Sequence, residues 1–125
     1  MIKKAVMTHL LENLTTNRLH FVGAPPKTET PYGVVSVVSA NRTLNHDGKG
    51  NLIAARMQID WFGTSDTEVE GLFEETQTAM DDFHGVQEEV VVYLCELDDE
   101  MDMHESDTGL FHKSFDYIIH YERGN

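Results

Sequence analysis

The stretch that decides the fold is 46–83, which reads HDGKGNLIAARMQIDWFGTSDTEVEGLFEETQTAMDDF. It opens with a polar turn, because Gly48 and Gly50 suit backbone angles that other residues avoid. Residues 52–62 then alternate between apolar and more polar side chains. Alternation of this length predicts a strand with one covered face and one more polar face.

A helix follows this strand almost at once. Ser65 and Glu68 have the spacing of a capping box, in which the two side chains satisfy free backbone donors at a helix start. The apolar side chains that follow recur at helical spacing and form one stripe: Val69, Leu72, Phe73, Thr76, Ala79, Met80 and Phe83. The best-specified part of the sequence therefore describes packing, and it contains no recognisable catalytic motif.

Residues 2–14 have the periodicity of a helix. Segments 32–40, 89–97 and 110–121 have the composition of strands. Strands joined by short connections pair antiparallel, and both helices must bury their apolar stripes. We therefore predict an α+β fold over residues 1–125, one domain. It would be an antiparallel sheet of four or slightly more strands, with two helices packed on one face, in the order α-β-β-α-β-β.

The composition is strongly acidic. Nine Lys and Arg face 22 Asp and Glu among 125 residues, for a formal net charge of −13. Such a chain repels nucleic acid phosphates and anionic membranes on average. The acidity can serve solubility alone, or it can form a surface that DNA passes without sticking. The single Cys95 excludes an intramolecular disulfide, and we interpret it as a small buried hydrophobic residue of a protein made in a reducing cytoplasm.

The sequence contains no strong catalytic, metal-binding or phosphate-binding motif. The seven histidines lack the close spacing of zinc ligands. Segment 96–107 is acidic but lacks the turn glycine of a calcium loop after Asp102, so we predict a solvated loop. Phosphate-binding and nucleophile motifs are absent as well. We expect no catalytic residue, no metal and no cofactor, and therefore no enzyme.

Two groups of residues are candidates for contacts with other proteins. The polar face of the 52–62 strand would present Arg56, Gln58, Asp60 and Phe62 to a neighbouring subunit. Because Trp61 and Phe62 are adjacent in a strand, they point to opposite faces, and the aromatic outside the core calls for a cover. The second group is acidic and would face a lumen or a partner: Asp98, Asp99, Glu100 and Asp102.

Several short motifs, in order, resemble the tail-completion or tail-terminator proteins of long-tailed bacteriophages and prophages. Pro31-Tyr32 opens a valine-rich strand, and His46-Asp47-Gly48 forms the turn. RMQID at 56–60 runs into the acidic start of a helix. DTGL at 107–110 and SFDY at 114–117 follow, and Tyr121 ends the pattern.

The resemblance implies a small α+β protein that forms a ring, usually of six subunits. Such a ring caps the finished tail tube and joins it to the head connector. Its partners would be further copies of itself, the tail-tube protein and the head-connector proteins. DNA would pass through without specific binding, and no membrane would be involved. The protein would be assembled in the host bacterial cytoplasm and reside in the virion at the head–tail junction.

Two other functions stay open at the level of sequence. One is a metal-dependent hydrolase that uses His104 and nearby carboxylates. The other is a small-ligand regulatory domain built on a ferredoxin-like sandwich.

Overall fold

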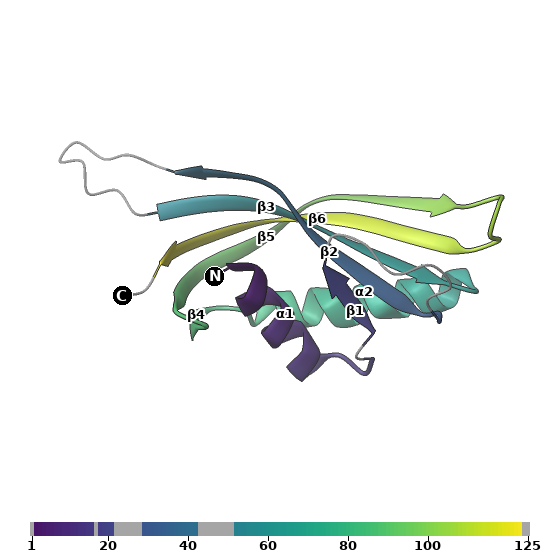
Figure 1. The fold of residues 1–125 in the computed structure, drawn as a ribbon, viewed down its shortest axis with the longest axis horizontal. Coiled ribbons are helices and arrows are strands. Elements are labelled where there is room, and N and C mark those ends of the chain that lie inside the picture. Colours follow the sequence, from purple (N-terminus) through teal and green to yellow (C-terminus); the bar gives the residue numbers. More distant parts are fainter. Residues whose placement is uncertain (1, 17, 22–28, 43–51, 124–125) are drawn as a thin grey trace.

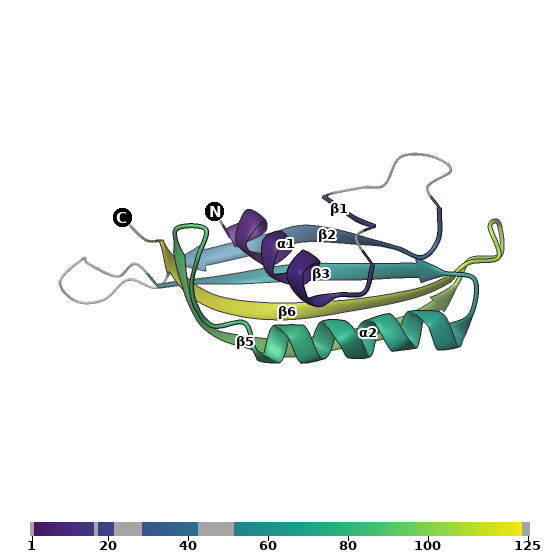
Figure 2. The same ribbon diagram turned by 90° about the horizontal axis from the view of Figure 1, so that it is seen from below.

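The computed structural model describes residues 2–16, 18–21, 29–42 and 52–123. The described chain forms a six-stranded sheet with two helices on one side (Figures 1 and 2). The turn predicted at 46–50 lies outside the described residues. The elements are α1 Ile2–Asn13, β1 Leu19–Phe21, β2 Tyr32–Arg42, β3 Leu52–Gly63, α2 Asp66–Asp81, β4 Gly85–Gln87, β5 Val90–His104 and β6 Phe111–Arg123.

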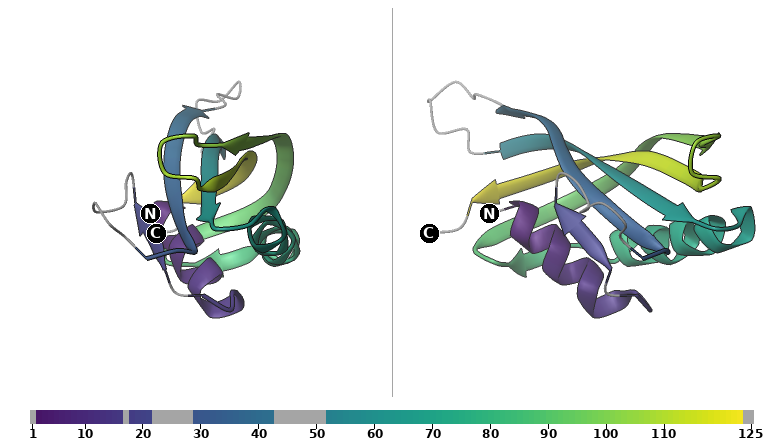
Figure 3. Two further views of the ribbon diagram at one scale, coloured as in Figure 1. Left: turned by 90° about the vertical axis from the view of Figure 1, so that its right-hand side faces the viewer. Right: turned by 45° about the vertical axis from the view of Figure 1, so that its right-hand side comes forward.

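The predicted four-stranded antiparallel sheet with the order α-β-β-α-β-β is wrong. The strand order is β1-β2-β3-β6-β5-β4, and the sheet is mixed because β1 pairs parallel with β2. The short strand β4 folds back antiparallel on β5 and adds the sixth strand. The whole sheet is curled like half a barrel (Figure 3).

Strand β4 went unpredicted because its turn has an unusual sequence. The register pairs Gln87 with Val90, so Glu88 and Glu89 alone form the turn. Both have positive φ, 48° and 66°, as a type I′ hairpin requires. That turn normally carries Asn-Gly, so two glutamates give no signal. Contacts from α1 hold Glu88: Lys4 Nζ lies 3.4 Å from one carboxylate oxygen and Thr8 Oγ1 lies 3.4 Å from the other.

Strand β5 is longer than predicted, and this corrects the interpretation of segment 96–107 as a loop. The strand continues to His104 and pairs with β6 as far as Phe111. Carboxylates are unfavourable in strands when like charges face each other. Here several contact basic side chains instead: Glu96 lies 2.8 Å from His120 of β6, Asp98 contacts Arg56, and Glu100 contacts Lys113. Those basic residues come from distant parts of the chain.

The core lies between the sheet and the helices. Every second residue of β3 from Ile53 to Trp61 is buried, as the alternation predicts. The indole N–H of Trp61 donates to Thr76 Oγ1 of α2 at 2.9 Å, and that hydroxyl donates to the carbonyl of Leu72 at 2.7 Å. The indole of Trp61 can therefore be buried without leaving its polar N–H unpaired.

The helices agree with the predicted spans. Ser65 caps α2 by accepting from the Glu68 N–H at 3.1 Å, and the Glu68 carboxylate accepts from the Thr64 N–H at 3.0 Å. His9 joins the two helices: its ring stacks on Phe83, and its Nε2 lies 2.6 Å from the Ala79 carbonyl of α2. Within the described residues, neither helix is long and apolar enough to cross a membrane.

Candidate assembly interface

The side of the sheet opposite the helices carries the predicted contact residues. We call this side the open face. Arg56, Gln58, Asp60 and Phe62 all lie there, because they alternate with the buried residues of β3. Their neighbours on β6 are, in register, Ile118, Asp116, Ser114 and His112. The open face is thus a mixed polar and aromatic surface spread over adjacent strands.

Arg56 joins the two residue groups predicted from the sequence. Its Nη1 lies 2.7 Å from Asp98 Oδ2 on β5 and 3.1 Å from Asp116 Oδ2 on β6. Hydrogen bonds to these carboxylates raise the pKa of Arg56 above its ordinary value. Its charge is therefore engaged within the chain, and the pair of carboxylates around one guanidinium leaves this part of the open face negative.

Asp60 is the buried polar centre of the open face. Its Oδ1 lies 2.7 Å from His112 Nε2, and Gln58 Nε2 donates to its Oδ2 at 3.0 Å. Burial alone would raise the pKa of Asp60, but hydrogen bonds from His112, Gln58 and Ser114 outweigh it and lower the pKa. The ionised form is therefore the one that the fold favours.

We expect Asp60→Asn to lower the free energy of unfolding by about 1–2 kcal/mol at pH 7, because charge-assisted hydrogen bonds weaken. The folded pKa lies below the ordinary value of 3.8. The contribution is therefore present above pH 3.8 and is lost as the pH falls through the folded pKa. Urea unfolding at pH 7 and at pH 3 measures this. The difference between variant and wild type should shrink at pH 3, whereas Glu12→Gln on the exposed side of α1 should have no effect at either pH. A constant difference would contradict the assignment.

Aromatic rings extend the open face from β2 to β6. The rings of Tyr32 and Phe62 stack with centroids 4.8 Å apart, and those of Phe62 and His112 stack at 4.0 Å. Phe62 is therefore covered partly by its own chain, with one ring neighbour on each side. Stacking of this kind fixes the orientation of the rings and stiffens the middle of the sheet.

The structure divides the predicted acidic group between the two sides of the sheet. Asp98 and Asp99 lie toward the open face, while Glu100 and Asp102 lie on the helix side and contact Lys113 Nζ at 2.9 and 3.1 Å. Glu70 of α2 adds a third carboxylate at 3.3 Å. The side chain of Lys113 is 4% exposed, so this cluster fastens β5 to β6 and α2.

Burial alone would lower the pKa of Lys113. Hydrogen bonds to Glu100, Asp102 and Glu70 outweigh that effect and raise the pKa. The ammonium also lies over the ring of Phe73, 4.5 Å from its centroid. The lysine therefore remains charged at all ordinary pH values. This cluster was not predicted, because its members come from three separate elements.

Exposed apolar side chains near the acids were also missed. Leu94, Met101 and Met103 are 51%, 57% and 38% exposed, and all three face β6 residues of the open face. The alternation of methionine with aspartate in EMDM was the available signal, because it is a strand pattern with one apolar side. Methionines on a surface adapt to the shape of a partner.

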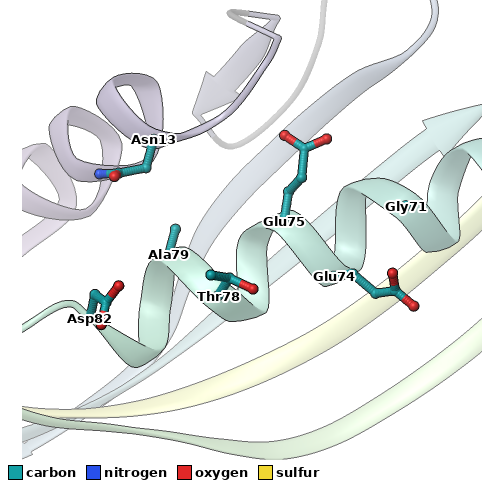
Figure 4. Close-up of a pocket in the computed structure, with 7 residues that line it drawn as sticks. All are labelled: Asn13, Gly71, Glu74, Glu75, Thr78, Ala79 and Asp82. Atoms are coloured by element: carbon teal, nitrogen blue, oxygen red, sulfur yellow. The ribbon is translucent and has the colours of Figure 1, made fainter.

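The described part of the chain has few features of a small-molecule or metal site. A groove of about 360 Å³ lies between the end of α1 and the outer side of α2. Figure 4 shows that the carboxylates of Glu74, Glu75 and Asp82, which line it, point apart. No group of three His, Cys, Asp or Glu side chains among the described residues could hold a metal ion. Burial, with a smaller effect of Asp81, raises the pKa of the Cys95 thiol to about 12.

Comparisons with known proteins identify a similar fold. No model of a known family matches the sequence, and no curated protein matches it either. Among solved structures, a chain described as "Virion of native gene transfer agent (GTA) particle" is similar with a TM-score of 0.73. The likeness covers 97% of this chain and 94% of that chain at 10% sequence identity. At this identity the likeness shows a shared fold.

Proposed function

We propose that this chain is a structural protein of a phage-like virion, and specifically the subunit of a tail-terminator ring. The ring caps the tail tube and provides the surface that joins the tube to the head connector. The observation that carries the proposal is the likeness to a chain of a gene transfer agent virion, which extends over almost the whole length of both chains. The motif order around the RMQID strand supports the finer assignment.

Features of the surface support an assembly role. The open face combines a stacked aromatic row with exposed Leu94, Met101 and Met103. Such a surface is typical of a contact with another protein. The net charge of −13 supports a ring through which DNA slides, because carboxylates repel phosphates and displace few counterions. The partners are then other copies, the tail-tube protein and the head-connector proteins.

Removal of the gene from its phage or prophage tests the proposal. A tube without a cap stays open to further tube subunits, so we expect tubes of irregular and excessive length that carry no heads. Negative-stain electron microscopy measures both. A plasmid copy of the wild-type gene should restore joined particles, and the exposed variant Glu12→Gln should restore them equally. Tails of normal length joined to heads would contradict the proposal.

A further inference from the structure

We propose that copies of this chain join edge to edge. The outer edge of β2 at 36–42 in one copy would pair with the outer edge of β5 at 93–99 in the next. This inference rests on the proposed ring and names the contact that builds it. The partner at each edge is a second copy of the same chain.

Both edges lack a described strand partner over these ranges. On one margin of the sheet, β1 pairs with β2 only from Gly33 to Val35. On the other margin, β4 pairs with β5 only from Val90 to Val92. Beyond these short pairings, no strand of the described residues pairs with either edge, and a strand edge of this kind offers backbone N–H and C=O groups on which a further strand can form.

The two unpaired edges lie on opposite margins of the sheet, and the strand register places them level with each other along the strand direction. The register runs across the sheet from Ser36 through Gln58 and Asp116 to Asp99. At the other end, Arg42 is connected in the same way, through Ile53 and Tyr121, to Val92. A neighbouring copy displaced sideways, without a shift along the strands, therefore brings one free edge against the other.

The exposed apolar side chains gather on the same two strands. Seven large hydrophobic residues are exposed among the described ones, and five of them belong to β2 or β5 beyond these short pairings. These five are Val38, Tyr93, Leu94, Met101 and Met103. A solvent-facing strand edge is normally protected by charge, proline or a β-bulge. β5 carries acids here, and both strands have register shifts within or beside these ranges. Exposed apolar side chains nevertheless lie on both strands, as expected of strands that are covered in an assembly.

Charge decides which edges can meet. Segment 93–99 contains Glu96, Asp98 and Asp99 and no lysine or arginine, while segment 36–42 contains no acid. Two β5 edges would bring carboxylates together, which is unfavourable. Pairing β5 with β2 avoids this repulsion and satisfies both edges. Such a head-to-tail contact repeats from copy to copy, and it gives a ring when the rotation between neighbouring copies closes.

The direction of the joint follows from the sheet. β2 runs antiparallel to β3, β3 to β6 and β6 to β5, so β5 runs opposite to β2. Copies related by rotation about an axis along the strands keep this direction. The joint is therefore antiparallel, the pairing with the more stable hydrogen-bond geometry, and the sheet would continue from each copy into the next.

A pair of substitutions that differ only in charge sign tests the joint. Val38 is 54% exposed on β2, and in the joint it lies near the acids of the next β5. We expect Val38→Asp to lower the fraction of ring at least tenfold, while Val38→Lys keeps it. Val86→Asp, on β4 at 79% exposure, should leave the ring unchanged. Native mass spectrometry counts the subunits, and circular dichroism checks that each variant is folded.

A disulfide test locates the contact. Ser39 and Glu96 occupy the same height, through Arg56 and Ile118. Within one copy they are three strand spacings apart, roughly 14 Å, which is beyond the roughly 7 Å that a disulfide spans. Ser39→Cys with Glu96→Cys in a Cys95→Ser background should therefore form a ladder of cross-linked copies under oxidation. Ser39→Cys with Val86→Cys should not.

The outcomes separate this inference from the proposed function. A wild-type ring that tolerates Val38→Asp and gives no ladder would overturn the edge joint and leave the ring proposal intact. A chain that stays monomeric at every concentration up to millimolar would overturn the joint, whereas the gene-removal phenotype would still decide the function. Loss of the ring with Val38→Asp, retention with Val38→Lys and a ladder together would support the joint.

Discussion

Replacement of Lys113 by alanine is expected to lower the free energy of unfolding by about 2 kcal/mol, because three charge-assisted hydrogen bonds to a buried ammonium are lost. Glu70, Glu100 and Asp102 would then lie close together without a cation, but they are 41%, 49% and 64% exposed, so water screens much of their repulsion. The aliphatic part of the lysine would also leave a gap beside Phe73. Urea unfolding followed by the fluorescence of Trp61 measures the loss.

Two further variants identify the cause. Lys113→Met keeps most of the volume and removes the charge, so it should recover the packing part alone. Adding Glu100→Gln and Asp102→Asn to Lys113→Met should recover much of the remainder, because the repulsion between carboxylates is then relieved. An alanine variant within about 0.5 kcal/mol of the wild type, the range of ordinary surface substitutions, would show that the cluster contributes little.

Trp61→Ala is expected to have the largest effect, a loss of about 4 kcal/mol. The side chain is fully buried, and its indole N–H is bonded to Thr76. Gly33 of β2 shows how closely the ring is enclosed, since a Cβ there would lie 2.7 Å from Trp61 Cζ3. Urea unfolding followed by circular dichroism measures the loss, because the variant has no tryptophan.

Tyr117→Phe is the matched control in the same core. The Tyr117 hydroxyl is buried and has no hydrogen-bond partner among the described residues. Its removal should change stability by no more than about 0.5 kcal/mol, or stabilise the protein, because an unpaired polar atom is lost. A large loss in Tyr117→Phe would mean that the hydroxyl has a partner, and a small loss in Trp61→Ala would mean that the core closes around the gap.

The predictable parts of the fold are those with local signals. The alternation in β3 and the capping box at Ser65 depend on neighbouring residues, and both agree with the structure. The acidic half of β5 has only the short alternation in EMDM as a local signal, and its carboxylates are balanced by Arg56 and Lys113, which are distant in sequence. The parallel pairing of β1 is also a tertiary property, since three residues carry too little periodicity to set a direction.

The candidate interface was also predictable only where the signal is local. Arg56, Gln58, Asp60 and Phe62 could be placed on one face because strand periodicity fixes faces. Their partners could not be predicted, because His112 and Asp98 come near them only when β6 pairs with β3 and β5 pairs with β6. The structure places Asp98 and Asp102 on opposite sides of the sheet for a related reason: the register shift between Leu97 and Asp99 changes which side the later residues face.

The central place of β6 has a consequence for synthesis on the ribosome. β6 lies between β3 and β5, and the β3 pairing joins residues as distant as Leu52 and Glu122. The middle of the sheet therefore cannot close until β6 has left the ribosomal exit tunnel. A nascent chain up to Leu110 exposes β3 and β5 without the strand that separates them, and contacts so distant in sequence form slowly. Until then the edges of β3 and β5 that β6 will occupy lack their partner, which favours aggregation of unfinished chains.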